Sequence, residues 1–220
     1  MFRVLQVLTA AEIAECKKIA AAAPFVDGRI TNPHNKSKVN EQLHDADAYK
    51  TSSQLLLAAL ARSEEFMEFA FPVAIAPPLI TRYKPGMKYG AHADAAFIAL
   101  PGTSLRSDLS ATIFLNDPKE YDGGELHIRL GDGDLKFKLK PGDAIVYPSN
   151  TLHQVMPVTR GERLVAITFI QSGIADAFRR NTLFELNEVA ALEGLKMSPE
   201  NFNRLQVVQS NLLRYWSDKP

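Results

Sequence analysis

The feature that most constrains this chain is a series of short segments, between residues 77 and 173, in which apolar and polar residues alternate. This two-residue period is that of β-strands, because successive side chains of a strand point to opposite faces. Turn sequences such as Lys84-Pro85-Gly86 and Lys140-Pro141-Gly142 separate the segments. The pattern predicts strands over residues 79–83, 89–93, 109–115, 124–130, 135–139, 143–147 and 164–170. No long helical pattern intervenes, so we expect a β-sandwich or barrel.

Helical patterns flank this region on both sides. Thr9 and Glu12 form a capping box that predicts a helix ending before Pro24. Further helical segments are predicted over residues 52–62, 64–70 and 174–195, with a new helix beginning at Ser198. The polar stretch 25–49 predicts loops with a short strand. We therefore expect a mainly β protein with flanking helices (α+β), divided into N-terminal helices and loops (1–76), a β core (77–173) and a C-terminal helical extension (174–220).

Composition and charge exclude several classes of function. The chain has 25 basic and 25 acidic residues, so it offers no excess positive charge to a nucleic acid. No apolar run approaches the ~20 residues of a membrane span, and the first residues lack the apolar core of a signal peptide. A single cysteine, Cys16, permits no internal disulfide and lies in a helical pattern, where we expect a core position. These features predict a cytoplasmic protein that binds neither nucleic acid nor membrane.

Two of the histidines and one aspartate are candidate metal ligands. The chain contains His34, His44, His92, His127 and His153. His92 and Asp94 are two residues apart on a predicted strand, so both side chains project from one face. His153 follows a later strand and can supply a third ligand. Two histidines and one carboxylate form the triad that holds iron(II) and leaves three positions open, whereas structural zinc prefers four ligands, commonly thiolates.

Arg163 connects this triad to a second chemical function. It lies ten residues after His153, at the start of the apolar strand 164–170. An arginine beside a barrel interior needs an anion, because an unpaired buried charge is costly, and its planar guanidinium fits a carboxylate. The combination predicts a redox metal next to a carboxylate anchor.

Several longer motifs resemble one protein family. They are Val26-Asp27-Gly28-Arg29, Arg82-Tyr83, Tyr89-Gly90-Ala91-His92-Ala93-Asp94, Asp108-Leu109-Ser110-Ala111-Thr112, Tyr121-Asp122-Gly123-Gly124-Glu125-Leu126, Tyr147-Pro148-Ser149, Pro157-Val158-Thr159-Arg160-Gly161 and Leu183-Phe184-Glu185-Leu186. Nearly end to end, the chain resembles the bacterial PKHD-type hydroxylases. These are members of the iron(II)- and 2-oxoglutarate-dependent dioxygenase superfamily, related to prolyl and lysyl hydroxylases.

The resemblance implies a fold, an activity and a site. The core would be a double-stranded β-helix (jelly roll), and the reaction would hydroxylate an unactivated C–H bond while 2-oxoglutarate becomes succinate and CO₂. Iron(II) would be held by His92, Asp94 and His153, the cosubstrate 2-oxoglutarate by Arg163, and Tyr83 would lie against that cosubstrate. O₂ is the second cosubstrate, and L-ascorbate would sustain turnover. Some family members are associated with iron uptake.

Other interpretations of the same residues stay open at this stage. A non-catalytic sensor of iron or 2-oxoglutarate would use the terminal helices to contact a protein partner. A cupin-like metalloenzyme without 2-oxoglutarate would leave Arg163 unexplained. The substrate can be a peptide, a siderophore-type compound or a free amino acid, and the apolar residues of the C-terminal helices allow a homo-oligomer. His127 is expected to face solvent or a groove, and Lys84 and Lys88 are either solvated or in contact with an anionic substrate.

Overall fold

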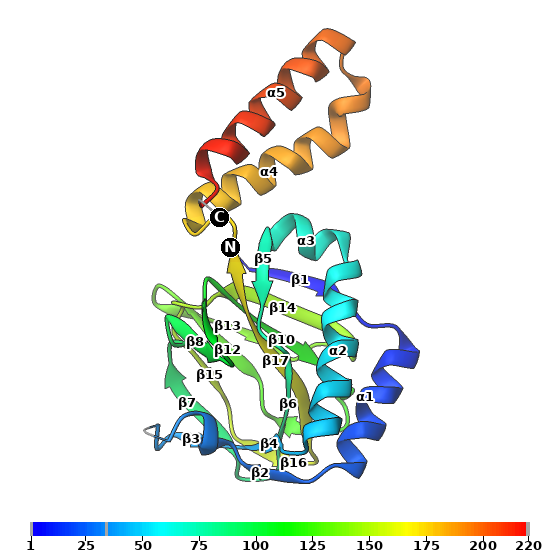
Figure 1. The fold of residues 1–220 in the computed structure, drawn as a ribbon. Coiled ribbons are helices and arrows are strands. Elements are labelled where there is room, and N and C mark those ends of the chain that lie inside the picture. The colour runs from blue at the N-terminus through cyan, green and yellow to red at the C-terminus, as the bar shows by residue number, and fades with distance from the viewer. Residues whose placement is uncertain (1, 34, 219–220) are drawn as a thin grey trace.

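Two antiparallel sheets form the body of the protein in this computed structural model, which describes residues 2–33 and 35–218 (Figure 1). His34 lies outside the described residues. The larger sheet has the order β1 (Arg3–Gln6), β14 (Asp143–Pro148), β10 (Leu109–Phe114), β17 (Arg163–Ser172), β6 (Leu79–Tyr83), β4 (Glu41–Leu43) and β2 (Phe25–Asp27), with β5 (Pro72–Ile75) beside β17. The smaller sheet has the order β13 (Gly133–Phe137), β12 (Leu126–Leu130), β15 (His153–Val155), β7 (Lys88–His92) and β3 (Lys38–Val39).

Two short ribbons complete the β structure. β11 (Asp122–Gly123) pairs with β16 (Val158–Arg160), and β8 (Phe97–Leu100) pairs with β9 (Thr103–Arg106). Every strand pair among the described residues is antiparallel, and within each sheet several paired strands are far apart in sequence. The predicted jelly-roll fold class, with flanking helices, is confirmed.

The apolar core has two parts, one on each face of the larger sheet. Between the sheets lies a cluster that includes Phe114, Leu126, Ile145 and Val165. On the opposite face the larger sheet packs against helices, and this explains why all six residues of β10 are buried. A strand buried on both faces loses its apolar–polar alternation, as β10 does.

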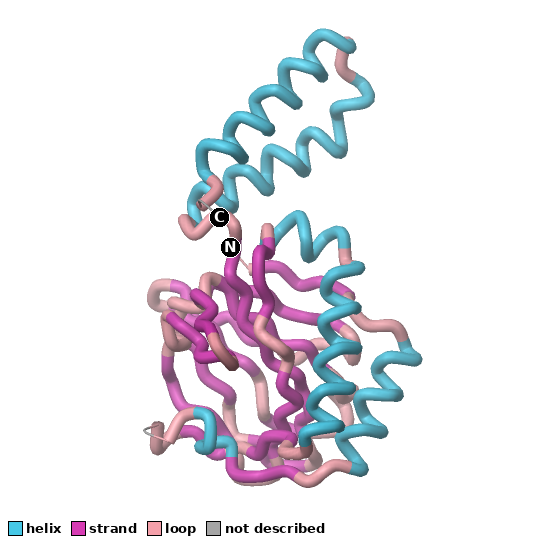
Figure 2. Tube along the Cα trace, viewed as in Figure 1, coloured by secondary structure: helices cyan, strands magenta, loops and turns pink. Residues whose placement is uncertain are grey.

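Three helices cover the outer face of the larger sheet: α1 (Ala10–Ala22), α2 (Ala46–Arg62) and α3 (Glu64–Ala70) (Figures 1 and 2). The predicted capping box at Thr9 is present, and Cys16 is fully buried as expected. α2 begins six residues earlier than predicted, because Asp45 caps it by accepting a hydrogen bond from the backbone N–H of Ala48. Short 3₁₀ turns occur at η1 (Gly28–Thr31) and η2 (Gly194–Lys196).

The last two helices form a hairpin that projects away from the barrel (Figure 1). α4 (Ala177–Glu193) contacts the body through Phe184, whose ring packs edge-on against Phe69 with centroids 5.4 Å apart. α5 (Pro199–Trp216) packs on α4 and has no fully buried residue. In the part of the chain that the structure describes, no helix combines the length and apolar character needed to cross a lipid bilayer.

The N-terminal region contributes strands as well as the predicted helices. β1 pairs with β14, and β2 and β4 extend the larger sheet beyond β6, while β3 joins the edge of the smaller sheet. These short polar strands have no clear alternation of their own, so only pairing with a neighbour identifies them. The division of the chain at residues 76 and 173 stays a prediction.

Candidate metal centre

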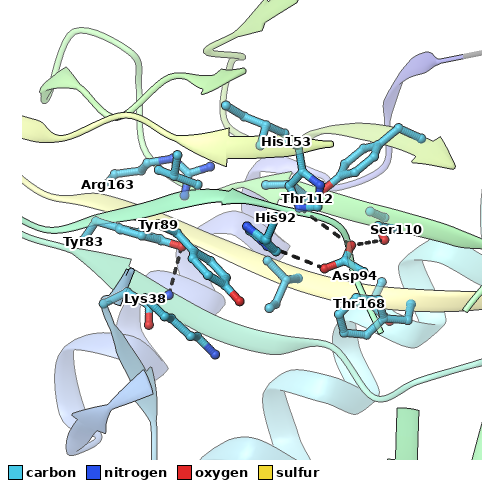
Figure 3. Close-up of a pocket in the computed structure, with 17 residues that line it drawn as sticks. Lys38, Tyr83, Tyr89, His92, Asp94, Ser110, Thr112, His153, Arg163 and Thr168 are labelled. Atoms are coloured by element: carbon cyan, nitrogen blue, oxygen red, sulfur yellow. Dashed lines mark hydrogen bonds and ion pairs between the residues drawn. The ribbon is translucent and has the colours of Figure 1, made fainter. Parts of the chain in front are cut away.

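The three predicted ligands converge where β7 meets β15. His92 ends β7 and His153 begins β15, and the two residues are directly paired in the antiparallel register. Asp94 follows β7 by two residues. One ligand atom from each residue lies within 4.8 Å of the others, which is close enough for all three to bind a single ion (Figure 3).

Backbone carbonyls orient both imidazole rings. Nδ1 of His92 lies 2.8 Å from the carbonyl oxygen of Gly90, and Nδ1 of His153 lies 2.9 Å from that of Thr151. A carbonyl only accepts, so each Nδ1 donates a hydrogen bond and each Nε2 is directed toward Asp94. The Nε2 atoms are 3.8 Å (His92) and 3.7 Å (His153) from the carboxylate oxygens. The two imidazoles and the carboxylate are thus arranged as ligands around one site.

A hydroxyl pair positions the carboxylate. Ser110 Oγ lies 2.5 Å from Oδ2 of Asp94 and 2.8 Å from Oγ of Ser149, and the backbone N–H of Asp94 donates to the carbonyl of Ser149. Ser110 belongs to β10, so the larger sheet orients a ligand that the smaller sheet carries. Ser110 is part of one of the motifs that resemble the family, but no role was predicted for it, because a serine within a strand has no local signature of such a contact.

Electrostatics keep the site ready for a cation. Burial, together with repulsion from His153, holds the pKa of His92 below its ordinary value, so its imidazole is neutral at pH 7. Two imidazole nitrogens and one carboxylate oxygen match the donors of a non-haem iron(II) centre. A closed structural zinc site would need a fourth ligand, and the described residues supply no group of four. The residues therefore fit iron(II).

Arg163 lies in the same cavity without a partner for its charge (Figure 3). It is 1% exposed, its Nε has no hydrogen-bond partner, and among the described residues no carboxylate lies within ion-pair distance. The rings of Tyr83 and Phe114 flank its guanidinium, with centroids 5.0 and 5.5 Å from Cζ. A buried cation of this kind requires an anion from a ligand, and the guanidinium geometry suits a carboxylate.

Gly124 makes room for this arginine. It has a positive φ of 67°, and a Cβ at this position would lie 3.0 Å from Cδ of Arg163 and 2.9 Å from a methyl carbon of Val158. Tyr83 is the register partner of Arg163 on β6, and its hydroxyl accepts a hydrogen bond of 2.9 Å from Asn40. The structure thus places Tyr83 beside Arg163 and on the wall of the same cavity.

The narrow inner cavity leads into a wider one of about 570 Å³. Residues that line both include Tyr89, His92, Asp94 and Phe169, so the metal site lies where the two meet. Apolar residues of β8 form one wall of the outer cavity, and Phe97 among them is 63% exposed. This volume is within the range of sites for small molecules. The β8–β9 ribbon was not predicted from the sequence.

The remaining predicted polar residues lie elsewhere. His127, expected to face solvent or a groove, is 9% exposed on the face of β12 opposite to His153, where it lines a small groove with Arg129 and Asp134. Lys84 pairs with Glu41 at 3.2 Å and Lys88 is exposed.

Comparison with known proteins places this chain in a family. A profile of the 2OG-Fe(II) oxygenase superfamily matches residues 78–171. A PKHD-type hydroxylase of Sphingopyxis alaskensis is 61% identical over 98% of this chain and 99% of its own, and one of Gluconacetobacter diazotrophicus is 37% identical over 98% of both chains.

Solved structures show the same fold at low identity. A prolyl-4-hydroxylase of Pseudomonas putida has a TM-score of 0.52 at 21% identity, over 78% of this chain and 92% of that one. A prolyl hydroxylase of Trichoplax adhaerens, solved with a peptide fragment of hypoxia inducible factor, has a TM-score of 0.57 at 13% identity, over 80% and 86%.

The fold and the relatives together define an iron(II)- and 2-oxoglutarate-dependent oxygenase, which acts with O₂. Within that class, the chain belongs to the PKHD-type hydroxylases.

Proposed function

We propose that this protein hydroxylates an unactivated C–H bond, with iron(II) held by His92, Asp94 and His153 and the distal carboxylate of 2-oxoglutarate bound to Arg163. The observation that carries the proposal is the presence, in one cavity, of three convergent ligand atoms and a buried arginine that has no counter-ion among the described residues. A metal triad by itself would also suit a hydrolase, and a buried arginine by itself would also suit a simple anion-binding protein. Together they match the two parts of this reaction: a redox metal and a dicarboxylate cosubstrate.

The protein's own residues supply orientation and exclusion of water. When bound, iron(II) and 2-oxoglutarate supply the O₂ activation and C–H cleavage that no side chain can perform. Ser110 and the carbonyls of Gly90 and Thr151 hold the ligands in place. Tyr83 forms a wall beside Arg163, where burial strengthens its pairing with a carboxylate.

L-Ascorbate belongs to this proposal as the reductant that sustains turnover. We include it because the centre needs iron(II) to react, and ascorbate can reduce metal that has become over-oxidised. A link to iron uptake stays a prediction that only the resemblance supports.

Conversion of 2-oxoglutarate to succinate without added substrate separates this enzyme from the sensor alternative. Purified protein with iron(II), 2-oxoglutarate, O₂ and ascorbate should form succinate slowly. Asp94→Ala should stop succinate formation, because it removes one of three ligands. His127→Ala is the matched control, since this imidazole lies on the other face of the sheet, and it should retain the rate. If iron-loaded protein binds 2-oxoglutarate yet forms no more succinate than Asp94→Ala, the protein is a sensor.

A further inference from the structure

Lys38 is a buried lysine that the sequence pattern gave no reason to select. It begins β3 and is paired with Tyr89 of β7, and it is only 4% exposed. Gly90 makes this approach possible: its N–H donates to the carbonyl of Ser37 at 3.1 Å, and a Cβ on Gly90 would lie 2.7 Å from Cβ of Ser37. Any side chain at position 90 would therefore push the β3 segment, and Lys38 with it, away from the site.

Among the described residues, the groups that contact the ammonium group of Lys38 are neutral. Nζ donates to the hydroxyl of Thr31 at 2.7 Å and lies 5.6 Å from the ring centroid of Tyr89. Among the described residues it has no carboxylate at ion-pair distance, whereas half-buried Lys84 has one in Glu41. A buried ammonium with one hydrogen bond retains donors for a further acceptor, and burial without a counter-ion is unfavourable. The side chains in contact with Lys38 therefore leave its charge uncompensated.

Lys38 and Arg163 occupy different parts of the connected cavities. Lys38 lines both the inner cavity and the wider outer one, whereas Arg163 lines only the inner cavity. An anion that contacts Lys38 can therefore extend into the outer cavity, along the apolar wall of Phe97, Ile98 and Phe169. An apolar molecule with one anionic end fits this combination.

Charge balance indicates how many negative charges that molecule carries. The cavity side chains contribute one negative charge from Asp94 and two positive charges from Arg163 and Lys38. A divalent cation and a dianionic cosubstrate cancel one another, so one positive charge remains. A single carboxylate on the substrate neutralises it, whereas a phosphate dianion would leave an excess negative charge.

We propose that Lys38 is a specificity-determining residue that binds the carboxylate of the substrate, and that the substrate is a small organic acid with an apolar body. This inference rests on the proposed function, because it places the acid beside the metal site. The outer cavity, about 570 Å³, accepts a small molecule of this kind. A carboxylate fixed at Lys38 would hold the apolar part of the acid near the triad.

The test measures binding rather than turnover. Full-length protein loaded with manganese(II) and 2-oxoglutarate is titrated calorimetrically with pairs of acids and their primary amides: hexanoate and hexanamide, 4-methylpentanoate and 4-methylpentanamide, phenylacetate and phenylacetamide. Each pair shares one apolar body and differs in charge. We expect at least one acid to bind about 10- to 100-fold more tightly than its amide, the range of a charge-assisted hydrogen bond. In Lys38→Met this ratio should fall to about one.

Matched variants distinguish Lys38 from other sources of preference. Lys88 is exposed on β7, where it pairs with Val39 of β3, and Lys88→Met should keep the wild-type ratio. A ratio that survives in Lys38→Met would place the carboxylate on the metal and overturn the inference. The inference would also be overturned if the wild-type protein bound none of the three acids more tightly than its amide. An equally large loss of 2-oxoglutarate affinity in Lys38→Met would assign Lys38 to the cosubstrate and also refute the proposal.

Two further measurements keep the result interpretable. If Lys38→Met does not fold, Lys38→Gln retains a hydrogen-bond donor for Thr31 and is subjected to the same titrations, with the same expected loss. Succinate formation by the wild-type protein reports on the proposed function separately. A protein that forms succinate but shows no acid preference refutes only the role of Lys38, and a protein that forms none refutes the proposed function itself.

Discussion

Replacing Arg163 with methionine tests the cosubstrate site with two readouts that should move independently. Methionine has a similar length and no charge, so Arg163→Met removes the guanidinium without leaving a large cavity. In the wild-type protein this guanidinium lies between the rings of Tyr83 and Phe114, and its Nε makes no hydrogen bond among the described residues. Its loss therefore removes a ligand contact but no ion pair of the folded protein.

The two expected magnitudes differ for that reason. A buried charge-assisted pair with a carboxylate contributes about 1.5–3 kcal/mol, so the Kd of 2-oxoglutarate should rise about 10- to 100-fold. The free energy of unfolding should stay the same or rise, because an uncompensated buried charge is replaced by an apolar side chain. A residue with a structural role would show the reverse: lower stability with unchanged affinity.

The assay combines calorimetric titration of 2-oxoglutarate into manganese-loaded protein with thermal denaturation followed by circular dichroism. Arg82→Met is the matched control, because Arg82 precedes Tyr83 on β6 but forms an ion pair with Glu41 at 2.5 Å. It should lose about 1 kcal/mol of stability or less and keep its affinity for 2-oxoglutarate. An unchanged Kd in Arg163→Met would refute the assignment of Arg163 to the cosubstrate, and a marked drop in its melting temperature would refute the claim that its charge is uncompensated.

Three further predictions concern the metal site and stability. Alanine at any of the three proposed ligands should abolish stoichiometric iron binding in metal analysis, and His127→Ala should retain it. If one of the three ligand variants keeps a full equivalent of iron, the replaced residue is not a ligand. The proposed ligands are His92, Asp94 and His153. Ser110→Ala removes the hydrogen bond that orients the ligand carboxylate, so manganese affinity should fall about 10-fold or more in titrations, and an unchanged affinity would contradict this role. Hydrogen bonds from Arg62, and to a smaller extent from Thr9, lower the pKa of Glu12 from 4.5 to about 2. These interactions should therefore stabilise the protein above pH 4.5 and lose their effect as the pH falls toward 2. Urea denaturation should therefore show a stability difference from Glu12→Gln at pH 7 that disappears near pH 2, and a constant difference would refute the coupling.

Local sequence signals were sufficient to predict the type and order of many elements. The alternation of residues 79–83 became β6, the turn Lys140-Pro141-Gly142 precedes β14, and the capping box at Thr9 begins α1. These signals work because strand alternation, turn geometry and helix capping depend on residues that are neighbours in sequence. The spacing of His92 and Asp94 is local in the same way, and their convergence was predictable from it.

Contacts between distant segments were decided only by the tertiary structure. His153 meets His92 because β15 pairs with β7 in one particular register, and Ser110 reaches Asp94 from the opposite sheet. Neither pairing leaves a trace in the local pattern, since a strand's period shows which side chains share a face but not which strand lies beside it. β1 and the β8–β9 ribbon went unpredicted for the same reason.

Lys38 shows this division most clearly. In the sequence it is one lysine in a polar stretch, while Lys84 and Lys88 stand closer to the metal-binding motif and were the lysines considered for an anionic substrate. Residue type alone predicts a solvated side chain for all three. Only the pairing of β3 with β7, which the absence of a side chain at Gly90 permits, buries Lys38 beside the site. The sequence determined which chemical groups the chain carries, and long-range strand pairing decided which of them lose contact with water and face the metal-binding residues.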